Sequence, residues 1–213
     1  MRAFAALLLA GGSTMLTAGC ATAGSGGPPK VDLLKLLDFK KDTVSGKWSF
    51  EGAVLLTSPT KFARIQVPFH PPAEYDVRLA AVRTAGTDSI VMGLVGGGRP
   101  FAVIVDAFEK NPFSGIERID GKAFPDNEAA HPGRIVETGK PVELVYSIRK
   151  DRVRVTLDGK PIIDWKADYA RVSPYEEWRT PDEKSLWLGS WTAPWRITAL
   201  ELTPVSGEGR LLR

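Results

Sequence analysis

Carboxylate pairs are the groups from which acid–base chemistry would be built, so their spacing is the first feature to weigh. Glu117 and Asp120 stand three residues apart and would face opposite sides of a strand. Glu176 and Glu177 precede Trp178 in a predicted loop, where a solvated charge pair is the expected arrangement. The sequence therefore shows no carboxylate pair that is placed for catalysis.

Metal-binding and phosphate-binding patterns are also lacking. His70 and His131 each precede a proline, have no companion cysteine and form no ligand spacing. Gly96–Gly98 lacks the Lys-Ser/Thr of a phosphate loop and is followed by a predicted strand, so it is expected to be a turn. Residues 126–128 offer oxygen ligands of the kind that bind calcium, but their spacing matches no defined calcium loop. We predict neither a metal nor a cofactor, and a solvated turn at residues 126–128.

Cys20 is the only cysteine in the chain, so no intramolecular disulfide can form. It follows Arg2, an apolar run over residues 3–10 and a boundary of small residues, which together predict a secretory signal that ends at a lipid-accepting thiol. Residues 11–14 interrupt the apolar run, which falls short of the roughly 20 residues that a spanning helix needs. The alternatives are an ordinary cleaved signal with a stray cysteine and an uncleaved N-terminal anchor.

The segment Leu16-Thr17-Ala18-Gly19-Cys20 resembles the lipobox of bacterial lipoproteins. It departs from the family pattern because Thr17 stands where the family has leucine. The resemblance implies a signal peptide over residues 1–19 and a diacylglycerol thioether on Cys20, with palmitate among the acyl chains. Ala21 takes the place of the aspartate that retains such proteins at the inner membrane. We therefore expect a lipid-anchored protein of the cell envelope, at the outer membrane and facing the periplasm or the surface.

The composition of the remaining residues predicts a tether, one folded domain and a short tail. Residues 20–30 are rich in Gly, Ser and Pro and predict a flexible tether. Residues 31–205 have a length and composition that suit one domain, and residues 206–213 are expected to form a C-terminal tail. The formal net charge is only +3, with basic and acidic residues interspersed, which argues against a nucleic-acid partner.

Short β-type runs separated by Gly, Pro and Asp dominate the domain, at about ten residues per strand, which is typical of an all-β sandwich or jelly roll. Residues 75–83 alternate Tyr75, Val77, Leu79 and Ala81 with more polar neighbours. Asp158-Gly159 between alternating runs predicts a tight hairpin. The firmest prediction is a three-stranded meander, with strands at residues 142–148, 153–157 and 161–165.

Residues 153–165, followed by residues 186–191 and a last β-run, are similar to the end of concanavalin A-like lectin/glucanase domains. That group includes laminin G-like modules and the 3-keto-disaccharide hydrolase domain. Further upstream, the chain resembles a bacterial envelope subgroup of the same superfamily at residues 32–34, 46–48, 72–76 and 98–101. The resemblance implies a concanavalin A-like β-sandwich of two antiparallel sheets, but the Glu-x-Asp-x-x-Glu pattern of its retaining glucanases is missing.

Sugar ligands in some members of this group lie across the concave face or its rim, which makes the tryptophans the first ligand candidates. On a strand over residues 186–191, Trp187 and Trp191 share one face, while Leu186 and Leu188 point into the core. Trp195, just after a proline, is a further candidate platform. The alternative is that these indoles only fill space beneath the loop at residues 167–184.

Two polar residues complete the predicted ligand site. Arg99 and Asp106, close to the Gly-rich turn, are candidates for hydrogen bonds to sugar hydroxyls. The predicted function is that of a noncatalytic carbohydrate-binding or interaction domain. Two alternatives stay open, which are glycoside hydrolysis and a structural envelope protein that binds another protein.

Overall fold

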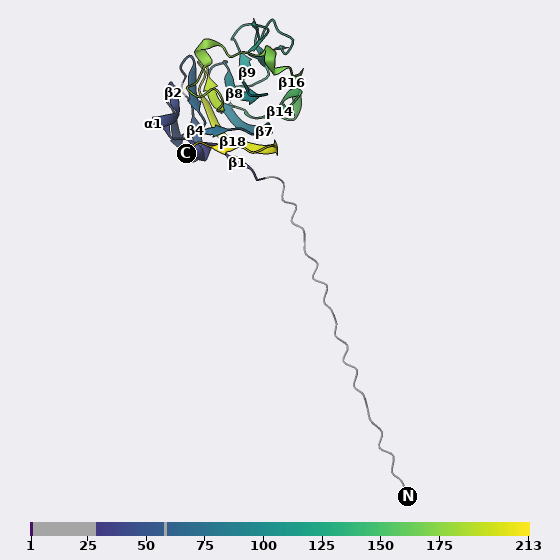
Figure 1. Cartoon of the computed structure of the whole chain (residues 1–213). Coiled ribbons are helices and arrows are strands. Elements are labelled where there is room, and N and C mark those ends of the chain that lie inside the picture. The colour runs from purple at the N-terminus through teal and green to yellow at the C-terminus, as the bar shows by residue number, and fades with distance from the viewer. Residues whose placement is uncertain (2–28, 58) are drawn as a thin grey trace.

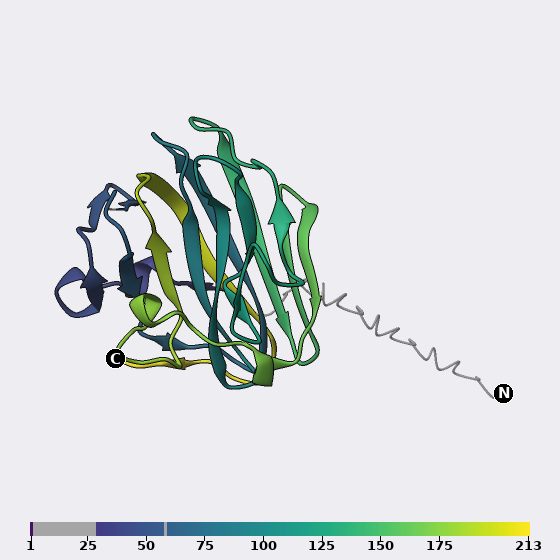
Figure 2. The ribbon, with the colours of Figure 1, turned by 90° about the horizontal axis from the view of Figure 1, so that it is seen from above.

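The computed structural model describes residue 1, residues 29–57 and residues 59–213. Cys20 and the predicted signal peptide, apart from Met1, lie outside the described residues. Cleavage of the signal peptide and lipidation of Cys20 therefore stay predictions. Within the described part, no helix is long and apolar enough to cross a membrane. The domain is built from two large antiparallel sheets that face each other (Figure 1, Figure 2), which confirms the all-β prediction.

The first sheet has the order β16-β15-β14-β7-β18-β4-β3, and β1 pairs with β18. Its long central strands, β7 and β18, pair antiparallel over most of their length. The predicted meander is confirmed as β14, β15 and β16. The strands are β1 (Val31–Asp32), β3 (Ser49–Glu51), β4 (Val54–Leu56), β7 (Glu74–Arg83), β14 (Pro141–Arg149), β15 (Arg152–Leu157), β16 (Lys160–Lys166) and β18 (Trp195–Ser206).

The second sheet has the order β13-β10-β9-β8-β17-β5-β2. Its strands are β2 (Thr43–Ser45), β5 (Ala63–Gln66), β8 (Ile90–Gly96), β9 (Arg99–Ala107), β10 (Phe113–Ile116), β13 (His131–Pro132) and β17 (Trp187–Ser190). Two small ribbons pair β11 (Arg118–Ile119) with β12 (Lys122–Ala123), and β6 (Phe69–His70) with β19 (Arg210–Leu211). Part of the expected C-terminal tail is therefore a paired strand. The helical turns are η1 (Leu34–Leu36), α1 (Phe39–Asp42), η2 (Tyr169–Arg171) and η3 (Glu176–Trp178).

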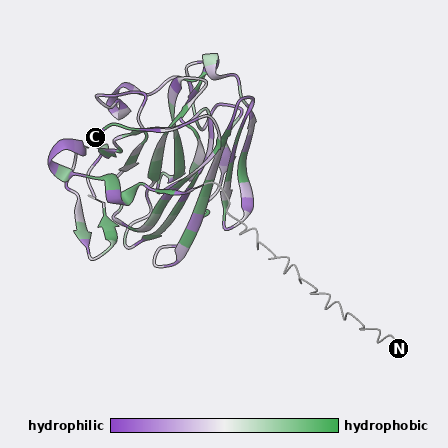
Figure 3. Cartoon of the chain, turned by 60° about the horizontal axis from the view of Figure 1, so that its bottom comes forward, coloured by the Kyte–Doolittle hydropathy of each residue, from purple (hydrophilic) through white to green (hydrophobic). Residues whose placement is uncertain are grey.

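Two-residue periodicity places one hydrophobic row of each strand between the sheets. In β7, the predicted inward residues Tyr75, Val77, Leu79 and Ala81 are all buried, and their neighbours along the strand are half-buried. Hydrophobic residues lie mainly along the strands (Figure 3). The apolar area removed from water between the two sheets is the main source of stability for such a fold.

Tight turns fix the register of the hairpins. Asp158 and Gly159 both have positive φ, at 48° and 77°, as a two-residue hairpin turn of this hand requires. Gly97 and Gly98 have φ of 55° and 74° and join β8 to β9, with Gly96 paired to Arg99. The Gly-rich segment is thus a turn, as predicted.

Candidate functional site

The outer face of the second sheet carries a hydrophobic cluster of its own. Val91 in β8, Ala102 and Ile104 in β9, and Trp187 in β17 belong to this cluster, separate from the main core. Leu188 points the other way, into the main core. The predicted division of strand 186–191 into an aromatic face and a core face is confirmed.

The loop that contains η3 covers part of this face. Trp178 stacks on Trp187 with ring centroids 5.4 Å apart and an interplanar angle of 18°. Gly93 leaves the space that the Trp187 indole fills, because a Cβ there would lie 1.9 Å from Trp187 Nε1. Trp187 is therefore buried under the loop, which is the space-filling alternative considered for it.

Beside this stack the outer face is hollowed into a pocket of about 470 Å³, which we call the aromatic pocket. Its walls come from β9, the segment between β7 and β8, the β10–β12 region and the η3 loop. The lining residues are Phe62, Asp88, Ser89, Ile104, Ala107, Phe108, Glu117, Arg118, Ala123, Phe124, Tyr175, Trp178 and Trp191. The volume is within the range of small-molecule sites.

Edge-to-face contacts hold the aromatic wall together. The Phe62 ring lies 4.4 Å from Trp191 at 84°, and 4.9 Å from Trp178 at 70°. Across the pocket, Phe108 stacks on Phe124 at 5.3 Å. Such pairs fix the orientation of rings beyond what burial alone achieves.

Two of these aromatic residues have strained backbones. Phe62 has a φ of 55° and Phe108 a φ of 68°, which is the left-handed region that bulky side chains rarely adopt. Phe108 is also 45% exposed, an uncommon position for a large apolar ring. Strained conformations concentrate at binding and catalytic sites, where the surrounding structure maintains them.

Glu117 is the buried acidic group of the pocket lining, with only 5% of its surface exposed. Burial raises the pKa of Glu117 to about 7, while a hydrogen bond from Tyr175 N to Oε2 (3.0 Å) and the nearby Arg118 lower it less strongly. The carboxyl group therefore changes protonation near neutrality and can donate or accept a hydrogen bond there.

The other charged groups of the pocket lie at aromatic rings or backbone amides. Arg118 lies over the Tyr175 ring at 4.6 Å, and Lys61 lies over Trp191 at 5.6 Å. Asp88 accepts a hydrogen bond from Ser89 N at 2.7 Å. The pocket thus combines apolar faces with a few polar groups, which is the usual composition of a small-molecule site.

Of the predicted ligand residues, only Trp191 lines the pocket. Trp195 is 1% exposed and lies between the sheets, where the Arg83 guanidinium sits 5.5 Å from its ring. The expected turn is instead the start of β18, and alternation directs Trp195 and Ile197 inward. The structure gives Trp195 no surface on which a sugar could stack.

Arg99 and Asp106 are separated by almost the whole length of β9, about 23 Å at roughly 3.3 Å per residue. Arg99 is exposed at the β8–β9 turn, far from the aromatic pocket. Asp106 is fully buried and accepts hydrogen bonds from Arg83 Nη1 (2.7 Å), Arg134 Nη1 (2.9 Å) and Ile135 N (2.8 Å). The expected joint role in binding hydroxyls is wrong, because the Asp106 carboxylate is used inside the protein.

Residues 126–128 form a turn held by internal bonds. Asn127 Nδ2 donates to Ile116 O at 2.8 Å, and Glu128 Oε1 accepts from Trp165 Nε1 at 2.6 Å and from Arg171 Nη1 at 2.9 Å. Among the described residues, no group of three or more His, Cys, Asp or Glu side chains could hold a metal ion. Trp165 and Trp48 are both buried.

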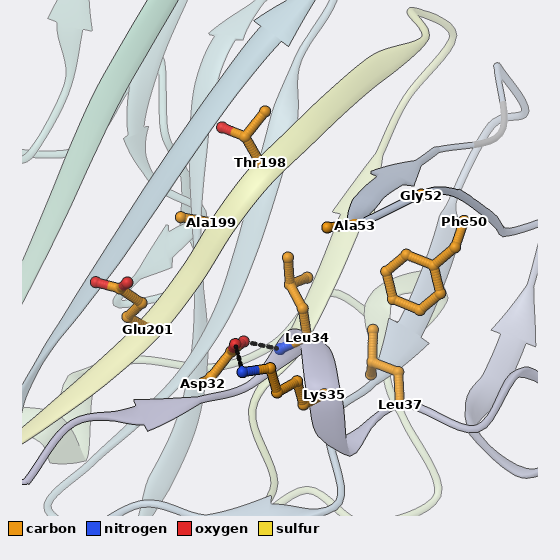
Figure 4. A pocket seen from close by; sticks show the side chains of 10 residues that line it. All are labelled: Asp32, Leu34, Lys35, Leu37, Phe50, Gly52, Ala53, Thr198, Ala199 and Glu201. Atoms are coloured by element: carbon orange, nitrogen blue, oxygen red, sulfur yellow. Dashed lines mark hydrogen bonds and ion pairs between the residues drawn. The ribbon is translucent and has the colours of Figure 1, made fainter.

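A second hollow, of about 310 Å³, lies between η1, the β3–β4 hairpin and β18 (Figure 4). Within it, Asp32 accepts from Leu34 N at 3.2 Å and pairs with Lys35 at 3.2 Å, while Glu201 pairs with Lys30 and Arg78 outside the hollow. Phe50 is its aromatic residue. This hollow has fewer aromatic residues in its lining than the aromatic pocket.

Sequence reasoning missed most of the pocket. The spacing of Glu117 and Asp120 predicts that the two lie on opposite sides of a strand, and Asp120 is exposed and bound to Arg171 while Glu117 is buried. The sequence carries one local signal for this pocket, because two large aromatic residues, Tyr175 and Trp178, stand three apart in a charged loop.

No family model and no curated protein matches the chain. Solved structures do. The chain is similar to the carbohydrate binding module CBM66 from Bacillus subtilis, with TM-score 0.55 and 13% identity over 76% of this chain and 94% of that one. It is also similar to the Crh5 transglycosylase in complex with NAG, with TM-score 0.56 and 9% identity over 85% and 86% of the two chains.

A third similar structure is the VIP36 exoplasmic/lumenal domain in its Ca2+/Man3GlcNAc-bound form, with TM-score 0.53 and 13% identity over 77% of this chain and 83% of that one. At these identities the likeness concerns the fold. The chain has a jelly-roll β-sandwich fold, which it shares with these three solved structures.

Proposed function

We propose that the protein binds a carbohydrate, without cleaving it, in the aromatic pocket. The observation that supports this most directly is the pocket itself, in which Phe62, Tyr175, Trp178 and Trp191 surround a buried carboxyl group. Its place on the outer face of a lectin-type sheet adds to the argument.

Sugar rings present both kinds of surface that this pocket complements. The C–H face of a pyranose is apolar and stacks on an aromatic ring, while its hydroxyls need donors and acceptors at the ring edge. Trp191 is half-buried and offers its indole to the pocket, and Glu117 and Asp88 supply oxygen atoms. The net charge of these groups is small, because Arg118 also lines the pocket and Lys61 lies over the Trp191 ring. A neutral glycan is the ligand that this arrangement favours.

A glycan array, followed by calorimetry with the full chain in detergent, tests the proposal. Trp191→Ala is expected to weaken binding at least about tenfold, the size of a stacking contact on one aromatic ring. Phe50→Ala is the matched control, since Phe50 is 39% exposed and lines the other hollow. Equal losses in both variants, or no glycan bound by the unmodified chain, would refute the proposed site.

Glycoside cleavage is the second candidate, and the protonation of Glu117 is the observation that favours it. A carboxyl group with a pKa of about 7 in an apolar pocket has the property required of a general acid. Incubation with 3-keto-disaccharides and with bound glycans distinguishes the two functions. Turnover that Glu117→Gln abolishes, while affinity is retained, would replace the binding function by catalysis.

Anchoring at the outer membrane through Cys20 is part of the proposal. It is supported by the sequence pattern before Cys20 and by Ala21 after it. A labelled palmitate analogue is expected to be incorporated into the unmodified chain and not into Cys20→Ser. Label that persists in Cys20→Ser, or that never appears, would contradict lipidation, and fractionation of the membranes tests the location.

A further inference from the structure

A buried ion-pair network lies behind one wall of the aromatic pocket. At its centre, the Asp106 carboxylate is fully buried between two guanidinium groups, those of Arg83 (2.7 Å) and Arg134 (2.9 Å). Asp106 itself has a φ of 61°, so β9 contains a left-handed residue one position before its last residue, Ala107. The network therefore sits at the point where β9 turns into the segment that presents Phe108.

Arg134 joins the two segments that form this wall. Its Nη1 atom donates to Thr87 O, next to the pocket residue Asp88. Its Nη2 atom donates to Phe108 O at 2.7 Å and to Glu109 O at 3.1 Å. One planar guanidinium thus ties residues 87–88 to residues 108–109.

Arg83 holds the same two segments from the core side. Its Nη1 atom donates to Asp88 O at 3.3 Å as well as to Asp106, and its Nη2 atom donates to Val136 O at 2.5 Å. The two cations face one carboxylate, and their other hydrogen bonds go to backbone carbonyl oxygens and, from Arg83 Nε, to the Thr138 hydroxyl at 3.0 Å. Of the two cations only Arg83 is fully buried, and its charge-assisted bonds offset part of the desolvation of the Arg83–Asp106 pair.

We infer that Arg134 is a positioning residue for the aromatic pocket, which holds Phe108 and Asp88 in place through Asp106 and the loop carbonyl groups. Arg83 keeps Asp106 paired when Arg134 is removed, so the sandwich persists while the pocket wall loosens. Arg134 is 28% exposed and lies outside the pocket lining, so it acts without touching the ligand. The effect on ligand affinity rests on the proposed function, whereas the effect on the loops does not.

Hydrogen–deuterium exchange of the full chain in detergent tests the loop effect without any ligand. In Arg134→Ala, peptides over residues 84–89 and 106–112 are expected to exchange about ten- to a hundredfold faster, while the sheet strands stay protected. Arg152→Ala is the matched control. Arg152 is also an arginine paired with a carboxylate, that of Asp164, but it lies on the other sheet and is 58% exposed. Unchanged exchange in Arg134→Ala, or the same increase in Arg152→Ala, would overturn the inference.

Affinity for cellohexaose, chitohexaose and mannohexaose tests the effect on the pocket. For a hexasaccharide that binds, Arg134→Ala is expected to weaken affinity about tenfold and Arg134→Lys less, since lysine keeps the charge but not the planar fork. Because Arg134 acts through Phe108, its removal in a Phe108→Ala background should cost clearly less than in the unmodified chain. Full additivity would overturn the positioning role. If no hexasaccharide binds the unmodified chain, the proposed function fails for these sugars, and the exchange result alone decides the role of Arg134.

Discussion

Neutralising Glu117 should change how the stability of the protein depends on pH. The pKa of Glu117 is about 7 in the folded protein, against 4.5 for an unperturbed glutamate, because burial disfavours the charged form. Between these two values the folded state binds more protons than the unfolded state. The free energy of unfolding therefore falls as pH rises from 4.5 to 7, and the stabilising contribution is fully present only below pH 4.5.

The size of the effect follows from the difference of about 2.5 between the two pKa values. At about 1.4 kcal/mol per pKa unit, Glu117 lowers the stability of the folded state by about 3 kcal/mol at most over this range. Glu117→Gln keeps an oxygen that can accept the hydrogen bond from Tyr175 N, but it cannot ionise. Its stability should exceed that of the unmodified chain above pH 7, by an amount that shrinks toward pH 4.5.

Urea unfolding at half-unit steps from pH 4.5 to 8.5 measures the difference between the two proteins. Subtracting one curve from the other removes the contributions of the other carboxylates, which both proteins share. Glu208→Gln, at an exposed site, serves as the control and should give a difference that is flat with pH. A flat difference for Glu117→Gln as well would refute the claim that Glu117 is a desolvated acid.

The remaining predictions concern side-chain packing and the buried Arg83–Asp106 ion pair. Trp195→Ala should lower the free energy of unfolding by about 3–5 kcal/mol, because it leaves a cavity between the sheets. Trp191→Ala should lower it by only about 1 kcal/mol, and thermal unfolding of the two variants measures the difference. Gly93→Ala should cost about 1–3 kcal/mol and alter the near-ultraviolet dichroism, since the added methyl group displaces the Trp187 indole. Asp106→Ala should cost about 3–5 kcal/mol in urea unfolding, because it leaves Arg83 buried without its carboxylate, and a loss under 1 kcal/mol would contradict the buried ion pair.

The strands were predictable because their signals are local. Alternation along residues 75–83 and the positive φ that Asp158-Gly159 accepts determine which residues face the core and where the chain reverses. The same alternation correctly placed Trp187 and Leu188 on opposite faces. It failed at Trp195 only because the strand starts there, one residue earlier than expected.

The aromatic pocket was not predictable from local patterns, because its residues come from segments far apart in the chain. Phe62, Glu117 and Trp191 meet only after β17 pairs between β5 and β8 and the η3 loop folds over the sheet. Periodicity gives the face on which a residue lies, but not which loop covers that face.

The sequence by itself determined an all-β sandwich, its hairpins and the aromatic side of β17, since each depends on neighbours along the chain. Only the tertiary structure decided that the Asp106 carboxylate is paired with Arg83 inside the protein and that Glu117 is desolvated enough to titrate near neutrality. The reason is physical: burial and charge pairing depend on the atoms that surround a group in space, and those atoms come from distant parts of the sequence.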